Sequence, residues 1–216
     1  SKKLKQMKMK KNVILLICLL SALICSYPAG AATGPHQLRY FTQGTNPATS
    51  DTPYGDNVQN GHYVQSDDAR IYYEVYGTGK PLVVLHGGGV GTPYEMGRLI
   101  DRLKQDFKVI VVSTRGHGRS EIGHSPLTYE QKALDVMKVI SDISLNEKVN
   151  VLGFSDGAFT ALKLAADAPA LVDRVIAIGA GTLAKGFFPD QISLSELEKI
   201  DWDFIEQQKK IMPEPD

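Results

Sequence analysis

A serine flanked by glycines, in the run Gly153-Phe154-Ser155-Asp156-Gly157, is the strongest candidate for chemistry in this sequence. A short apolar run precedes it, and a helix-like run rich in alanine follows it. This pattern between a strand and a helix is typical of a sharp turn that exposes a nucleophilic hydroxyl, because glycine tolerates strained backbone and close packing. We therefore predict that Ser155 is a nucleophile for acyl transfer.

A second candidate segment, His86-Gly87-Gly88-Gly89, also follows an apolar run. Glycines allow backbone N–H groups to approach a charged oxygen, so we expect the amides of Gly88 and Asp156 to form a two-donor oxyanion hole. His86, Gly87 and Gly89 are expected to support this loop. The alternatives are an ordinary flexible loop or a phosphate-binding loop, but the sequence lacks a Gly-Lys-Ser/Thr ending and dinucleotide-type glycine spacing. The pattern implies neither a metal nor an organic cofactor.

A third polar segment, residues 113–120, reads Ser-Thr-Arg-Gly-His-Gly-Arg-Ser. We expect Arg115 and His117 to hold this loop through hydrogen bonds. A histidine that precedes the nucleophile is in the wrong chain order for the general base. Arg115 is therefore predicted to be a supporting residue.

These candidates must be positioned by the elements around them. Four continuous apolar runs are typical of strands buried on both faces of a parallel sheet, and they occupy residues 81–85, 109–112, 149–152 and 175–178. Two alternating runs around a turn at 66–68 predict an antiparallel hairpin, at residues 62–65 and 70–76. Helical spacing or capping patterns predict helices over 94–105, after Thr128, directly after Ser155, and from Ser193. The sequence thus predicts an α/β fold, with helices on both faces of a mostly parallel sheet.

The first 32 residues have the pattern of a secretory signal peptide: six lysines, twelve mostly apolar residues at 13–24, and small residues near Ala31. The apolar run is shorter than the about 20 residues that span a bilayer. We therefore expect cleavage and export to the periplasm or the extracellular space. The alternative is an uncleaved membrane anchor, which would be the only contact with a membrane.

Removal of residues 1–32 would change the chain that remains. Both cysteines, Cys18 and Cys25, would be lost, so disulfides, a thiolate nucleophile and zinc–thiolate sites are excluded from the mature chain. Six lysines and no acid would also be lost, which would change the formal net charge from zero to −6. Nucleic acid is therefore not an expected partner.

The rest of the chain divides into three parts by composition. Residues 33–61 are rich in Gly, Pro, Thr, Asn and Asp without periodicity, which predicts a linker or extended arm. Residues 62–182 contain the predicted sheet. Residues 183–216 are expected to begin a lid of helices that selects the substrate.

Four motifs in chain order together resemble the α/β-hydrolase superfamily: His86-Gly87-Gly88-Gly89, the Arg-Gly-His-Gly-Arg-Ser run at 115–120, Ala-Leu-Asp-Val at 133–136, and the turn around Ser155. The resemblance covers about residues 64–181. The Ser-Asp-Gly turn is similar to that of the valacyclovir-hydrolase-like and proline-iminopeptidase-like branches, which hydrolyse small esters and amides. The resemblance implies a serine hydrolase with a small ester or amide substrate and no cofactor, represented here by its N-terminal two-thirds.

The sequence departs from the family pattern in three ways. Ser113 stands where many relatives have Asp, and Ala158 replaces a frequent glycine. The family also places an acid and then a histidine after the nucleophile, whereas all five histidines precede Ser155, at positions 36, 62, 86, 117 and 124. We expect the acid and base to be absent from this chain and the chain alone to be inactive, since serine without a base is a poor nucleophile. The alternatives are a non-catalytic binding or receptor module on the same scaffold and an inactive truncated fragment.

Overall fold

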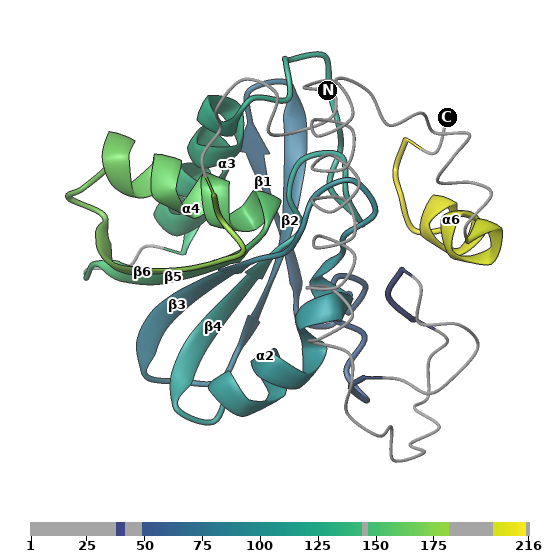
Figure 1. The fold of residues 1–216 in the computed structure, drawn as a ribbon, viewed down its shortest axis with the longest axis horizontal. Coiled ribbons are helices and arrows are strands. Elements are labelled where there is room, and N and C mark those ends of the chain that lie inside the picture. The colour runs from purple at the N-terminus through teal and green to yellow at the C-terminus, as the bar shows by residue number, and fades with distance from the viewer. Residues whose placement is uncertain (1–37, 42–48, 144–146, 182–200, 215–216) are drawn as a thin grey trace, which may run out of the picture. The chain divides into compact units, whose positions relative to one another are not determined.

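Six strands form one mixed sheet in the described part of the chain, in the order β1-β2-β4-β3-β5-β6 (Figure 1). The computed structural model describes residues 38–41, 49–143, 147–181 and 201–214. The strands are β1 (Gly61–Ser66), β2 (Ala69–Tyr76), β3 (Lys80–Leu85), β4 (Phe107–Val112), β5 (Val149–Phe154) and β6 (Val172–Ile178). The predicted signal peptide and most of the predicted lid, up to residue 200, lie outside the described residues.

The two halves of the sheet differ in strand direction. β1 and β2 form the predicted antiparallel hairpin, in which Ser66 pairs with Ala69, and β2 is also antiparallel to β4. The neighbours β4-β3, β3-β5 and β5-β6 are all parallel. The predicted fold class, a mostly parallel sheet with an antiparallel N-terminal pair, is confirmed.

The described helical segments are the 3₁₀ helix η1 (Pro93–Met96), α2 (Gly97–Leu103), α3 (Tyr129–Asp142), α4 (Asp156–Asp167) and α6 (Trp202–Lys209). At the start of α3 the Thr128 side chain accepts the Gln131 backbone N–H, as the capping pattern predicts. The helix expected over 94–105 is divided, because Pro93 begins a tight 3₁₀ turn from which α2 continues.

The core lies on both faces of the sheet because successive strand residues point to opposite sides. In β3, Val83 and Leu85 belong to a cluster with α3 and α4, whereas Leu82 and Val84 belong to a cluster with η1 and α2. Figure 1 shows α3 and α4 next to each other, in agreement with their packing in the coordinates. Helices therefore cover both faces of the sheet. The carboxyl ends of the parallel strands β4, β3, β5 and β6 lie together at one edge.

The described residues of the predicted linker pack against this core. Tyr54 is 1% exposed, its hydroxyl donates to Asp101, and its ring meets Tyr76 edge-on. The amides of Gly55 and Asn57 donate to the buried carboxylate of Glu74. Residues 49–60 therefore pack against the folded unit. The polar composition of this segment did not indicate the buried Tyr54 ring or the backbone amides that bind Glu74.

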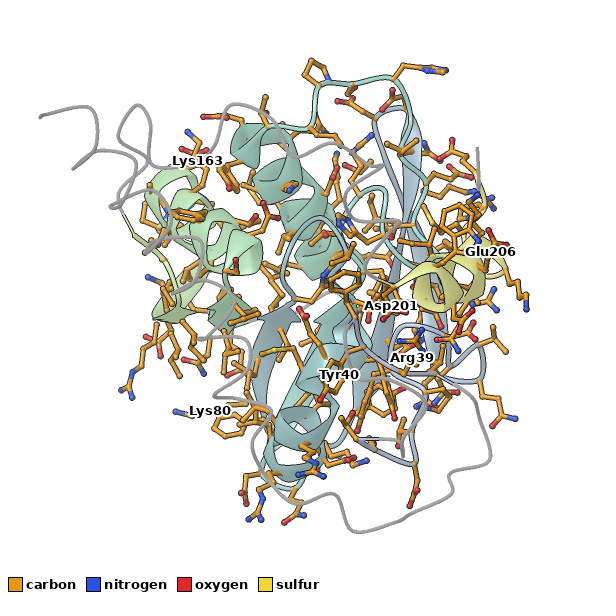
Figure 2. All side chains as sticks on the ribbon, turned by 45° about the vertical axis from the view of Figure 1, so that its right-hand side comes forward. Arg39, Tyr40, Lys80, Lys163, Asp201 and Glu206 are labelled. Atoms are coloured by element: carbon orange, nitrogen blue, oxygen red, sulfur yellow. The ribbon has the colours of Figure 1, made fainter. Side chains whose placement is uncertain are left out.

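A short N-terminal segment, residues 38–41, contacts α6. Arg39 donates two hydrogen bonds to the Asp201 carboxylate, at 2.5 and 2.6 Å, and the two side chains lie side by side in Figure 2. The rings of Phe41 and Phe204 meet edge-on. Asp201 also caps α6 by accepting the Phe204 N–H, so the ion pair and the helix start depend on the same carboxylate.

β6 is the outer strand of the described sheet beyond β5. Ile176 in this strand is 54% exposed, which differs from the double-sided burial expected from its apolar run. None of the helices in the described ranges is long and apolar enough to cross a membrane.

Candidate active site

Ser155 lies on a strained turn between β5 and α4. Its φ of +51° is in the left-handed region that non-glycine residues rarely adopt, at a cost on the order of 1–3 kcal/mol. The turn is held by the Ser155 N–H, which donates to the Ile178 carbonyl at 2.8 Å. The side chain is partly exposed at the carboxyl end of the sheet, where an incoming molecule could reach its hydroxyl.

The glycines around Ser155 are required by close backbone contacts. A Cβ on Gly153 would lie 2.2 Å from the Gly157 carbonyl oxygen. A Cβ on Gly157 would lie 2.5 Å from the carbonyl oxygens of Leu85 and His86. Because backbone atoms cannot move aside as a flexible side chain can, the G-x-S-x-G spacing is a packing requirement of this turn.

The structure brings together Gly88 and Asp156, the two residues expected to supply oxyanion donors. A Cβ on Gly88 would lie 2.8 Å from both Cβ and Cγ of Asp156. Within the described part of the chain, neither the Gly88 amide nor the Asp156 amide donates to a protein acceptor. Asp156 begins α4, where the first N–H groups have no partner in the helix and the helix dipole favours negative charge.

His86 is fully engaged beneath the glycine loop. Its Nε2 accepts the Thr114 N–H at 3.1 Å, so its Nδ1–H donates to the Gly87 carbonyl at 2.6 Å. Burial holds the pKa of His86 well below its usual range, and the neighbouring His117 acts in the same direction. His86 is therefore a neutral side chain that ties the loop after β3 to the loop after β4.

Glu95 of η1 holds the same loop from another side. Its carboxylate accepts the Gly87 N–H at 2.6 Å. No cation pairs with this carboxylate among the residues the structure describes, and burial raises its pKa to about 7. The Gly87 amide is thus occupied, while the next amide, that of Gly88, has no acceptor in the part of the protein that the structure describes.

Asp156 has a cationic partner from α3. Lys132 Nζ lies 2.6 Å from Asp156 Oδ2, and the ammonium also lies over the Tyr129 ring at 5.5 Å. Burial and the Asp156 charge raise the pKa of Tyr129 to about 12. The acid beside Ser155 is therefore part of an ion pair.

Arg115, which is itself fully buried, is the centre of a second polar network. Its guanidinium binds both oxygens of Asp135, at 2.8 and 2.9 Å, and Asp68 at 2.7 Å. It also donates to the backbone carbonyls of Ser66 and Ile122. These contacts cross-link the β1–β2 turn, the loop after β4 and α3.

The other histidines do not supply a general base within the described residues. The His117 Nδ1 contacts the Arg115 carbonyl at 3.0 Å, and burial lowers the pKa of His117. His62 on β1 stacks on Tyr73. His36 lies outside the described residues. In the described ranges, no three carboxylate, imidazole or thiol side chains come together as metal ligands.

Glu95 and Lys132 were not identified from the sequence. Lys132 stands one and two turns before Val136 and Val139, on the apolar stripe of α3, and a charge on such a stripe is a signal that could have been read. Glu95 lies between the buried residues Tyr94 and Met96. Its partner is a backbone amide eight residues earlier, which leaves no pattern in the sequence.

Comparison with known proteins places this geometry in one family. The sequence model described as "alpha/beta hydrolase fold" matches residues 80–207. The chain is 33% identical over 114 residues to a soluble epoxide hydrolase from Corynebacterium sp., covering 53% of this chain and 39% of that protein. It is 29% identical over 117 residues to pyrrolizixenacetamide deacetylase from Xenorhabdus hominickii, covering 54% and 44%.

The solved structures agree with the sequence relatives. The epoxide hydrolase CorEH superposes with a TM-score of 0.53 at 28% identity, covering 69% of this chain and 55% of that one. The matched region spans less than half the length of the two sequence relatives. The family match at residues 80–207 includes both the serine turn and the glycine loop.

Proposed function

Because this chain belongs to the alpha/beta hydrolase fold family, we propose that it is part of a serine hydrolase of small esters or amides. One observation carries the proposal: a strained, glycine-flanked turn holds Ser155 next to Asp156, which packs against Gly88, and neither the Gly88 nor the Asp156 amide has an acceptor among the described residues. A nucleophile and two preorganised donors are what acyl transfer requires at a carbonyl carbon. The deacetylase relative, by its name, removes an acetyl group, which supports the amide or ester class.

In the proposed reaction the Ser155 Oγ bonds to the substrate carbonyl carbon while its proton passes to a general base. The carbonyl oxygen becomes an oxyanion that accepts hydrogen bonds from the Gly88 and Asp156 amides. Collapse of this intermediate breaks the bond to the alcohol or amine, which leaves with the proton. Water then attacks the acyl-enzyme, releases the carboxylic acid and restores the serine.

We assign the base and its acid partner to parts of the protein outside the described residues. His86 is unsuited to the role because both ring nitrogens are engaged and its pKa is held low. The lysine-rich start and the apolar run at 13–24 favour export of the protein, which we also propose. Fractionation of producing cells would test this, and an unprocessed chain in the cytoplasm would contradict it.

The mechanism is tested with the protein expressed from its complete gene. A fluorophosphonate probe should label Ser155, and Ser155→Ala should remove both labelling and hydrolysis of p-nitrophenyl acetate. Ser141→Ala is the matched control, because Ser141 is exposed near the end of α3 and should leave labelling unchanged. A folded wild-type protein that is not labelled would reject the enzyme and favour a binding module. Unchanged turnover in Ser155→Ala would reject Ser155 as the nucleophile.

A further inference from the structure

We propose that Lys132 is a positioning residue that neutralises the Asp156 carboxylate beside the oxyanion donors. The inference rests on the function proposed above and extends it to a residue on α3, which does not touch the reacting atoms. The structure supports it through the ion pair, the position of the carboxylate and the charge state of its neighbours.

The ion pair is short and mostly withdrawn from water. Lys132 Nζ lies 2.6 Å from Asp156 Oδ2, with side-chain exposures of 10% and 18%. The pair joins the first turn of α3 to the first residue of α4, two helices that pack against each other. Withdrawing an ammonium from water is costly unless it is paired, so the contact is specific to the folded arrangement.

The carboxylate lies where an unbalanced charge would oppose the reaction. A Cβ on Gly88 would be 3.2 Å from Asp156 Oδ1, so this oxygen is next to the glycine loop. The Asp156 backbone amide is part of the same residue. A negative charge at this place would repel a developing oxyanion, and the repulsion is larger in a partly buried site than in water.

The other titratable groups around the pair cannot balance this charge near neutral pH. Burial lowers the pKa of His86 and of His117, which lie after β3 and β4, so both are neutral. Tyr129 on α3 has its pKa raised to about 12 and is also neutral. Among these described neighbours, Lys132 is the group that carries a positive charge.

The test is a double-mutant cycle in the protein expressed from its complete gene, with p-nitrophenyl acetate as substrate. Lys132→Met should lower kcat by roughly 10- to 100-fold, with KM changed by less than about twofold, because the charge acts on the transition state. In the Asp156→Asn background the same change should lower kcat by less than about threefold, because the negative charge is already removed. Lys132→Arg should retain most of the turnover.

The matched control is Lys163→Met on α4, labelled in Figure 2. Lys163 pairs with Glu130 and Asp167 at 3.0 and 3.2 Å on the outer side of the helices, and its loss should leave kcat unchanged. An equal loss of kcat from Lys132→Met in both backgrounds would overturn the proposal, because it would show a packing effect. A wild-type kcat in Lys132→Met would also overturn it. An unlabelled, inactive wild-type protein would instead reject the proposed function.

Discussion

The Arg115 network and the Lys132–Asp156 pair both involve α3, yet they are built differently. Arg115 is fully buried and its guanidinium is saturated by two carboxylates and two backbone carbonyls. The Lys132–Asp156 pair has one short contact and retains some exposure to water. Asp156 directly follows Ser155 in the chain. The Arg115 guanidinium has no N–H left to donate to a substrate. The Lys132–Asp156 pair, in contrast, sets the net charge next to Ser155.

This difference separates an effect on folding from an effect on chemistry. Loss of one partner from a buried ion pair leaves an uncompensated charge, which the folded state must accommodate without water. Loss of one partner at a partly exposed pair is compensated in part by solvent. We therefore expect the Arg115 network to control stability and the Lys132–Asp156 pair to control turnover.

The largest expected effect is that of Arg115→Met on stability. It should lower the free energy of unfolding by about 3–5 kcal/mol, because Asp135 would remain buried without its partner. Urea unfolding monitored by circular dichroism measures the loss. Arg115→Lys should recover only part of it, since an ammonium cannot form the bidentate contact. A loss below about 1 kcal/mol would remove the distinction between the two networks.

Glu95 differs from both ion-paired groups, because no cation among the described residues pairs with its carboxylate. Its pKa of about 7 lies above the ordinary 4.5, so the folded state binds the proton more tightly than the unfolded state between these values. Stability from this group is therefore present at low pH and is lost as pH rises towards 7 and beyond. Between pH 4.5 and 8 the wild-type protein should lose about 3 kcal/mol more than Glu95→Gln. Thermal unfolding at a series of pH values measures this, and parallel profiles would contradict it.

The smallest expected effect is the stability change of Lys132→Met, about 1 kcal/mol. The Asp156 side chain is 18% exposed, so water can solvate part of the carboxylate that remains. Lys163→Met, at a more exposed pair, should show no measurable change. Urea unfolding of both variants measures the change in the free energy of unfolding. A loss as large as that of Arg115→Met would show that the Lys132 pair is a folding element.

The local patterns predicted the fold well where burial is continuous. The apolar runs at β3, β4 and β5, the hairpin of β1 and β2, and the Thr128 cap are confirmed. Residues 49–60, predicted as part of a linker or extended arm, pack on the core through Tyr54 and through backbone amides such as that of Gly55, which composition does not reveal. β6 begins at Val172, before its apolar run, because Val172 already pairs with Val149 of β5.

For the candidate site, the residue types were evident from the sequence, whereas their partners were not. A glycine–serine–glycine turn after a buried strand and a glycine run after another led to the prediction of Ser155, Gly88 and Asp156, because such turns need glycine for close backbone contacts. That Glu95 occupies the Gly87 amide, and that Lys132 pairs with Asp156 24 positions later, was decided by the packing of η1 and α3 against the sheet. Burial and charge depend on which surfaces meet. The sequence thus determined the turn, and the tertiary structure determined its electrostatic surroundings.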